Sequence, residues 1–365
     1  MDRARALTCT AAVVVCLVGF EPLPVPGQTI PPASPALQSA QSPTMAPTPA
    51  VQPALPPAAR AVAYANLQWL LSQTTVGLAS RARVNEARAE GRASEVAAEE
   101  QRRLQSLMHP LTRTLRVRYG LGMVLALDRS GLIWADEALD LTGELKSMLD
   151  GAQPAAERRD VQPIERIGIV NVGRLAEESK LGKRLQGRAD ANPAAEFQRR
   201  LGPVISEFGR EASLRLLFSA ADSGIVWSDP RLDATSAVVG RLDKATDRKA
   251  PVPIPWPEPP PAVFSYVRLR VLGERAGLAR ESTAAVERLS EKVASGRASV
   301  GDRRELADAE ARLKREILAE VAALAERECR ARGITLLLSI GDSGILDADG
   351  AIDLTETLLK ALGQR

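Results

Sequence analysis

Cysteine and histidine are almost absent from this chain of 365 residues. It has three cysteines and one histidine, and two of the cysteines, Cys9 and Cys16, lie in an N-terminal segment that we expect to be removed. The remaining Cys329 has no partner for an intramolecular disulfide, and together with His109 it supplies too few ligands for a zinc site. A Ser-His-Asp mechanism would depend on His109 alone. The scarcity of cysteine and histidine therefore argues against a zinc site and against hydrolysis by a Ser-His-Asp triad.

Aromatic residues and net charge are also scarce. Four Trp, three Tyr and five Phe are the only aromatic residues, so the cores must be built mainly from Ala, Leu, Val and Ile. The net charge of +3 is too small for a nucleic-acid-binding surface over the whole protein. No glycine-rich phosphate loop follows a predicted strand. We therefore predict no nucleic-acid partner and no cofactor.

A long hydrophobic run occurs near the N-terminus. Residues 6–20 are apolar and follow Arg3 and Arg5, but the run is shorter than the ~20 residues that a membrane-spanning helix needs. We interpret residues 1–27 as a signal peptide with cleavage after Gly27. A lipid anchor at Cys16 is less favoured, because the residue before it is not small.

The next segment, residues 28–60, is predicted to be a disordered linker. Between Glu21 and Arg60 the chain has twelve prolines and no charged residue, a composition that cannot bury a core. Such a segment serves as a tether at the cell envelope or is a passive leader, and the sequence leaves both interpretations open.

One sequence pattern recurs three times without a gap, in residues 128–149, 221–242 and 341–362. A glycine, two aspartates and a threonine keep the same spacing in each copy. The superposed residues are Gly131, Gly224 and Gly344; Asp136, Asp229 and Asp349; Asp140, Asp233 and Asp353; and Thr142, Thr235 and Thr355. A fixed internal period of this kind indicates three copies of one structural unit.

Each copy is predicted to have the same order of elements. An apolar strand precedes the glycine, the residues after the glycine form the second strand of a hairpin, and an apolar spacing of three and four then indicates a short helix. Aspartate and threonine at the helix start are expected to cap it, with a capping box from Asp353 and Glu356 in the third copy. Calcium binding by the six aspartates is the less favoured interpretation. Trp134 and Trp227 share one position and are expected to be largely buried against the strands.

A further strand is predicted to open each repeat, in the runs that start at Ala61, Arg166 and Ala262. The segment between this strand and the recurring pattern is helical and rich in Ala, Arg, Glu and Leu. Each such segment is broken once, around Gly91, at Asn192-Pro193 and between Ser295 and Asp302, which predicts two helices folded back on each other. Half-segments of about 18 to 25 residues correspond to arms roughly 27 to 37 Å long.

The whole pattern, including Asn66-Leu67 and Asn171-Val172 after the first strands, resembles the Skp/OmpH family of periplasmic chaperones. The third copy departs from it with Arg268 in place of the asparagine. The resemblance covers three repeats, residues 61–150, 166–246 and 262–363, joined by linkers 151–165 and 247–261, the second of which is rich in proline. It implies an α+β fold in which strands form a central β-body and helical arms enclose unfolded outer-membrane proteins. Members are usually homotrimers, so three repeats in one chain predict a monomeric single-chain pseudotrimer in the periplasm.

Charge is distributed unevenly along the predicted elements. Residues 77–118, 173–215 and 268–332 carry 9, 9 and 15 basic residues against 5, 6 and 12 acidic ones, whereas acidic residues predominate in the rest of the mature chain. Basic arms would attract acidic client chains or an anionic membrane surface. The candidate client-binding residues are Arg102, Arg103, Arg199, Arg200, Arg303 and Arg304. Solubility and Glu–Arg pairs along a helix explain the same residues without any client.

Two functional classes follow from these features. The favoured one is an ATP-independent holdase chaperone, and the alternative is an envelope scaffold or interaction protein that retains the same body. Residues 341–344 (Gly-Asp-Ser-Gly) match the tetrapeptide around the nucleophile of chymotrypsin-like proteases, but the equivalent Ser130 and Ser223 occupy the same turn in the other repeats. The pattern is therefore typical of a turn, and we predict that the protein is not an enzyme.

Overall fold

The computed structural model describes residues 60–89, 92–152, 161–186, 192–220, 224–247, 249, 255–295, 298–340 and 344–363. The predicted signal peptide and nearly all of the predicted linker 28–60 lie outside these residues. The α+β class is confirmed: the described residues form twelve α-helices and three mixed sheets of three strands each. None of the described helices has both the length and the apolar character needed to span a bilayer.

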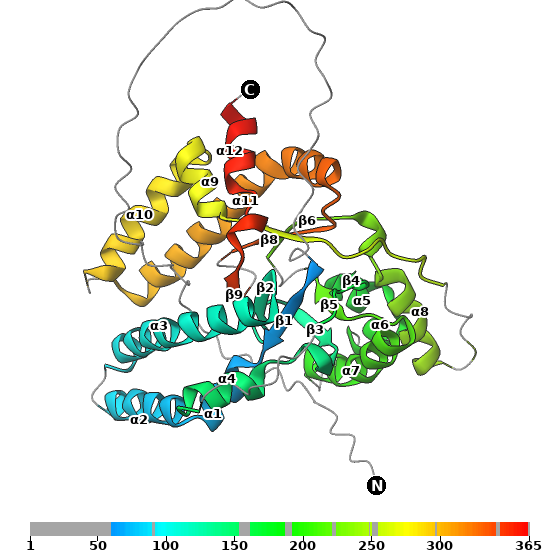
Figure 1. Cartoon of the computed structure of the whole chain (residues 1–365), viewed down its shortest axis with the longest axis horizontal. Coiled ribbons are helices and arrows are strands. Elements are labelled where there is room, and N and C mark those ends of the chain that lie inside the picture. The colour runs from blue at the N-terminus through cyan, green and yellow to red at the C-terminus, as the bar shows by residue number, and fades with distance from the viewer. Residues whose placement is uncertain are drawn as a thin grey trace, which may run out of the picture.

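The element order is the same in each repeat (Figure 1). Repeat 1 contains β1 (Val62–Ala65), α1 (Leu67–Gln73), α2 (Thr75–Ala89), α3 (Ala93–Tyr119), β2 (Met123–Ala126), β3 (Leu132–Ala135), η2 (Glu137–Leu139) and α4 (Thr142–Leu149). Repeat 2 contains β4 (Ile167–Val170), α5 (Val172–Glu178), α6 (Lys180–Gln186), α7 (Pro193–Glu211), β5 (Leu216–Ser219), β6 (Ile225–Ser228), η3 (Pro230–Leu232) and α8 (Thr235–Thr246). Repeat 3 contains β7 (Phe264–Val267), α9 (Leu269–Ala276), α10 (Arg280–Ala294), α11 (Val300–Arg332), β8 (Leu336–Ser339), β9 (Ile345–Ala348), η4 (Gly350–Ile352) and α12 (Thr355–Gly363).

The predicted hairpins are wrong, because the last strand of each repeat pairs with a different repeat. The three sheets have the strand orders β1-β2-β9, β3-β5-β4 and β6-β8-β7. The first two strands of a repeat pair in parallel, and the third strand of the preceding repeat in the cycle adds antiparallel to them. Repeat 1 thus completes the sheet of repeat 2, repeat 2 that of repeat 3, and repeat 3 that of repeat 1.

The turn at the recurring glycine directs the chain out of its own sheet. Gly131, Gly224 and Gly344 have φ angles of 65°, 61° and 62°, a conformation in which a side chain is strained. A Cβ on Gly344 would lie 2.6 Å from the carbonyl carbon of Arg129, so Gly344 packs closely against the turn of repeat 1. The same glycines accept backbone hydrogen bonds across the interfaces, as in Ala126 N to Gly344 O at 2.7 Å. Glycine is therefore required both for the backbone conformation and for the close approach.

The aspartates and the threonine tie each short helix to the first strand of its repeat. Asp140 accepts a hydrogen bond from the Thr142 N–H at 2.8 Å, and the Thr142 hydroxyl accepts one from the Asn66 N–H at 2.8 Å. Thr235 and Thr355 make the equivalent contacts. The capping box predicted in repeat 3 does not form: the Asp353 carboxylate binds the Thr355 N–H, and Glu356 pairs with Arg275 instead. The Glu356 carboxylate, which the capping box would have used, is instead bound by an arginine that is distant in the sequence.

The helical segments fold back as predicted, but the three arms are unequal. The breaks fall between α2 and α3, between α6 and α7, and between α10 and α11. The returning helices have 27, 19 and 33 residues. In Figure 1 the arms of repeats 1 and 3 extend to the left, and the shorter arm of repeat 2 lies at the lower right. Arm 2 is the shortest of the three, and both of its helices, α6 and α7, contact α8.

A second bend in each outgoing helix was not predicted. Between α1 and α2 the Thr74 hydroxyl accepts from the Gly77 N–H at 3.2 Å, and between α5 and α6 the Ser179 hydroxyl accepts from the Gly182 N–H at 3.0 Å. A Cβ on Gly182 would lie 1.8 Å from the Ala176 carbonyl oxygen. Glycine three residues after Ser or Thr thus permits the two helices to meet at a sharp angle.

The apolar core is divided into two clusters. The larger one joins strands of all three repeats, and the smaller one belongs to repeat 2 together with side chains of β3. Trp134 and Trp227 are only half-buried, contrary to the prediction, because each packs at the edge of a cluster against the neighbouring repeat. Trp256 anchors the linker before repeat 3: its ring lies 5.8 Å from that of Phe208, and its indole N–H donates to the Asp233 carbonyl at 3.0 Å.

Candidate functional site

The six candidate arginines lie on the returning helices of the three arms. Each pair is exposed and sits in the N-terminal part of its helix, the end of the arm that is remote from the sheets. The structure therefore places the three pairs on separate arms, at unequal distances from the sheet ends of their helices, and does not gather them into one patch. The pairs are Arg102 and Arg103 on α3, Arg199 and Arg200 on α7, and Arg303 and Arg304 on α11.

Several of these arginines are already paired with carboxylates of their own arm. Both Arg199 and Arg200 bind Glu196, at 2.7 and 2.6 Å, and these contacts hold the pKa of Glu196 below its ordinary value. Arg103 lies 3.5 Å from the buried carboxylate of Glu100. Such pairs at three or four residues contribute a few tenths of a kcal/mol to the helix. These arginines thus have a structural role in addition to any role with a partner.

Arg303 and Arg304 differ from the other candidates. Both are exposed, and their side chains make no ion pair with any residue that the structure describes. Just before them, the Ser299 hydroxyl and the Asp302 carboxylate form a capping box at the start of α11, and Asp302 also pairs with Lys292 of α10. Lys292, followed by the hydrogen bonds from Ser299, lowers the pKa of Asp302 to about 2. Among the described residues, two cations without an ion pair therefore lie beside the capped start of α11.

The apolar side chains that remain exposed gather on arm 1. Within the described residues, all four exposed large hydrophobic side chains belong to this arm: Trp69, Leu78, Leu107 and Val117, with exposed fractions of 42%, 50%, 39% and 64%. The ion pair between Arg83 of α2 and Glu100 of α3, at 3.1 Å, fixes the alignment of the two helices. Leu78 lies five residues before Arg83 and Leu107 seven residues after Glu100. In an antiparallel pair these two leucines consequently lie at nearly the same level.

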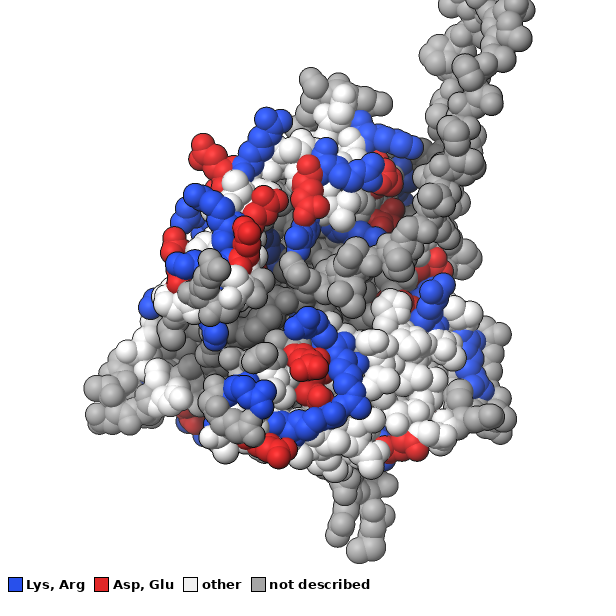
Figure 2. Space-filling view, turned by 90° about the vertical axis from the view of Figure 1, so that its left-hand side faces the viewer, with Lys and Arg blue, Asp and Glu red and all other residues white. Residues whose placement is uncertain are grey.

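Basic and acidic side chains are mixed on the arms. Figure 2, which faces the side toward which arms 1 and 3 extend, shows Lys and Arg interleaved with Asp and Glu on both visible groups of charged residues. Two open hollows occur on arm 3, of about 480 and 590 Å³, and the second is lined by Arg280, Arg288 and Arg312 together with Glu281 and Glu316. Apart from Leu278 in the first hollow, neither is lined by the large aliphatic or aromatic side chains that are typical of a small-molecule site.

The recurring aspartates act as caps and ion-pair partners. Asp136, Asp229 and Asp349 each accept a backbone N–H two residues later, at 2.9 to 3.0 Å. Among the described residues no cluster of His, Cys, Asp or Glu is arranged to hold a metal ion. The carboxylates are therefore occupied by the backbone in the way that the spacing predicts.

The residues with nucleophilic or basic chemistry stand apart from one another. Ser130 is fully buried in its turn, whereas His109 is exposed on α3. Ser343 of the protease-like tetrapeptide lies outside the described residues. Burial, followed by the neighbouring Glu328, raises the pKa of the Cys329 thiol to about 12.

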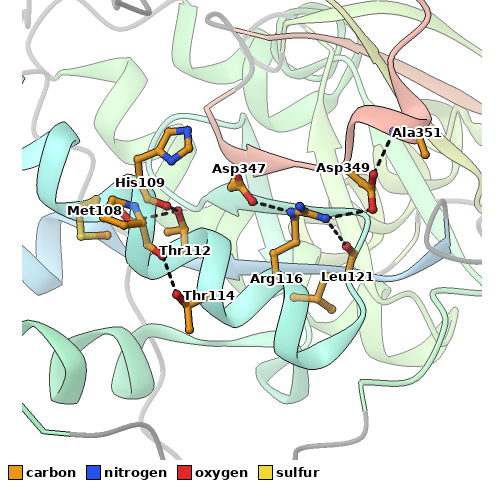
Figure 3. Close-up of polar contacts among 10 residues, drawn as sticks. Met108, His109, Thr112, Thr114, Arg116, Leu121, Asp347, Asp349 and Ala351 are labelled. Atoms are coloured by element: carbon orange, nitrogen blue, oxygen red, sulfur yellow. Dashed lines mark hydrogen bonds and ion pairs between the residues drawn. The ribbon is translucent and has the colours of Figure 1, made fainter. Parts of the chain in front are cut away.

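The buried ion pair between Arg116 and Asp347 was not predicted from the sequence. Arg116, in the last turn of α3, binds Asp347 of β9 at 2.5 Å and Asp349 at 3.1 Å, and it donates to the Leu121 carbonyl at 3.5 Å (Figure 3). The Arg116 and Asp347 side chains are only 12% and 8% exposed. The signal was present in the repeat alignment, because Asp347 stands where the other repeats have tryptophan.

A comparison of the chain with protein families, with curated proteins and with solved structures finds no match.

Proposed function

We propose that this protein is an ATP-independent periplasmic holdase that binds unfolded outer-membrane proteins, and that it is a single-chain pseudotrimer of Skp-like repeats. The observation that carries the proposal is the pair of exposed leucines on arm 1, Leu78 and Leu107. A soluble helical hairpin gains nothing from half-exposed Leu78 and Leu107 at one level, unless another chain covers them. Unfolded barrel proteins expose apolar side chains every second residue and supply such a cover.

The cyclic strand exchange supports the pseudotrimer. Each of the three sheets receives its third strand from another repeat of the same chain, so the cycle closes without a second molecule. We expect the mature protein to be monomeric at micromolar concentration in light scattering. A stable trimer in that measurement would contradict a single-chain assembly.

The basic side chains near the ends of the arms add attraction over a longer range. They raise the encounter rate with acidic client chains, whereas apolar contact with arm 1 slows release. In this proposal the arginines of the arms speed client capture, and Leu78 and Leu107 retain the bound client. Reversing the six candidate arginines to Glu should therefore lower the association rate and flatten its dependence on salt, because exposed charges are screened beyond ~8 Å at physiological ionic strength.

A scaffold function is the second candidate, and the short length of arm 2 favours it. Its returning helix has 19 residues against 27 and 33 in the other two arms, so an enclosure made of three arms is incomplete on this side. A scaffold would use the same surfaces to dock folded envelope proteins and would not suppress aggregation.

The deciding experiment is dilution of a urea-unfolded outer-membrane barrel protein into buffer with and without the purified mature chain. We expect the parent to suppress light scattering by aggregates, and Leu78→Ser with Leu107→Ser to lose most of this effect while keeping the parent's urea midpoint. Val117→Ser is the matched control, because it makes the same change from apolar to polar ten residues, or ~15 Å, along α3 from Leu107. Absence of suppression by the parent would favour the scaffold, and equal loss in the control would remove the leucine pair from the mechanism.

A further inference from the structure

The three strand-exchange interfaces share one geometry. At the end of each returning helix a backbone N–H donates at 2.9 Å to the carbonyl five residues earlier: Leu121 to Arg116, Leu214 to Gly209, and Ile334 to Cys329. Arg116, Gly209 and Cys329 are therefore equivalent positions on α3, α7 and α11. The glycine alignment makes Asp347, Trp134 and Trp227 equivalent positions on the incoming strands β9, β3 and β6. In each interface these helix and strand elements contact each other.

Although the geometry is shared, the chemistry at these two positions differs in every interface. Between repeats 3 and 1, Arg116 binds Asp347 in a nearly buried ion pair (Figure 3). Between repeats 1 and 2, the Trp134 ring rests on Gly209 so closely that a Cβ there would lie 2.7 Å from Cδ2 of the ring. Between repeats 2 and 3, Cys329 is fully buried in the cluster against which Trp227 packs. No two interfaces use the same pair.

Each pair excludes the strands that belong to the other interfaces. A tryptophan strand placed against α3 would put an indole ring where Arg116 now binds Asp347, and would leave Arg116 only the recurring aspartate as a partner. In the opposite error, β9 placed against α7 or α11 would bury Asp347 without a cation at the equivalent helix position; both arrangements are costly. The Trp134 ring leaves no space for a Cβ at position 209 of the facing helix. The same ring position would therefore clash with the Cβ of Cys329, the equivalent residue on α11. The cation for the recurring aspartate also differs: Arg116 serves Asp349, and Arg215 serves Asp136 at 2.7 Å.

We propose that Arg116–Asp347, Gly209–Trp134 and Cys329–Trp227 form a pairing code that admits each exchanged strand only into its own sheet. Each sheet thus accepts the third strand of one particular repeat, the preceding one in the cycle. The code fixes the cyclic order of the repeats, because each strand fits only one of the three sheets. A mispaired strand would leave another sheet without its third strand, and that open edge could pair with a second copy of the chain. The code goes beyond the proposed function, because it holds for a chaperone and for a scaffold alike.

The first test rebuilds one interface as another. In the full mature chain, Arg116→Gly with Asp347→Trp copies the Gly–Trp pair into the interface between repeats 3 and 1. We expect each single variant to lower the urea midpoint and the double variant to recover much of that loss. After refolding at high protein concentration, the double variant should contain several-fold more oligomer in light scattering than the parent. The control, Arg116→Lys, keeps a cation facing both Asp347 and Asp349 and should refold to monomer.

A milder test uses one small change, in case the buried-charge variants fail to fold. Cys329→Gly gives two interfaces the same Gly–Trp pair, whereas the control Cys329→Ala retains a Cβ that Gly209 lacks. We expect more oligomer after refolding of the glycine variant than of the alanine variant. Equal oligomer fractions in this pair, or a rebuilt double variant that is no more stable than its singles, would overturn the code.

Discussion

Replacement of Gly209 by alanine tests whether packing between repeats outweighs local helix preference. Gly209 is a buried residue in the last part of α7, and the added Cβ would lie 2.7 to 2.9 Å from three atoms of the Trp134 ring. Ordinary contact between carbon atoms is ~3.5 to 4.0 Å, so the ring must move by nearly 1 Å. Overpacking of this size costs about 1 to 3 kcal/mol. Alanine in place of glycine inside a helix gains about 1 kcal/mol.

The clash with Trp134 and the helix preference of alanine oppose each other. Whether Gly209→Ala stabilises or destabilises the protein therefore depends on whether Trp134 is present. In the parent chain we expect Gly209→Ala to destabilise by about 1 kcal/mol, because the clash exceeds the helix gain. With Trp134→Ala already present the clash is gone, and the same change should stabilise by up to about 1 kcal/mol. The coupling between the two positions is thus about 1 to 3 kcal/mol, within the range of direct neighbours.

Urea unfolding followed by circular dichroism measures all four members of this cycle without depending on tryptophan fluorescence. Gly143→Ala in α4 is the matched control, since a Cβ there meets no atom within 4 Å, and it should be neutral or stabilising. If Gly209→Ala stabilises the parent as much as the control does, or has one effect in both backgrounds, Trp134 does not rest on Gly209 as described.

Three further predictions concern other parts of the molecule. Gly182→Ala should destabilise by more than ~2 kcal/mol, because its Cβ would meet the Ala176 carbonyl oxygen at 1.8 Å, and equal urea midpoints would contradict the bend. The carboxyl of Asp302 should titrate near pH 2 by nuclear magnetic resonance, and Lys292→Met should raise that pKa. Because the folded pKa is depressed, the stabilising pair is present above the ordinary pKa and lost as pH falls through about 2; an unchanged titration in the variant would be a refutation. The Cys329 thiol, with its pKa raised to about 12, should resist alkylation at pH 8 until urea unfolds the chain, and rapid labelling of the folded protein would contradict its burial.

The features that were predicted well depend on residues close together in the chain. The breaks between arm helices follow from glycine, serine and the Asn192-Pro193 pair, and Asn192 indeed caps α7 by accepting the Ala195 N–H. The aspartates bind N–H groups two residues away. Such contacts form in any environment that leaves the segment helical, so a single sequence suffices to predict them.

The features that were missed depend on the choice among distant partners. The strand after Gly131 has the same alternation whether it folds back on β2 or crosses to β5, and nothing local distinguishes the two. The half-buried state of Trp134 followed from that crossing. Glu356 was assigned to a capping box because its true partner, Arg275, lies 81 positions away in the sequence. Arg116 was hidden for the same reason, with Asp347 separated from it by 231 positions.

The sequence by itself therefore determined that there are three units, what elements each contains, where the helices turn and which carboxylates cap them. It did so because backbone geometry and capping are short-range, and a threefold repetition shows them three times. Only the tertiary structure decided that the third strand of every unit belongs to its neighbour, and which side chains meet at the three interfaces. Those outcomes depend on burial and on charge pairing between segments that are far apart along the chain. The energies of these contacts are set only when folding brings the segments together.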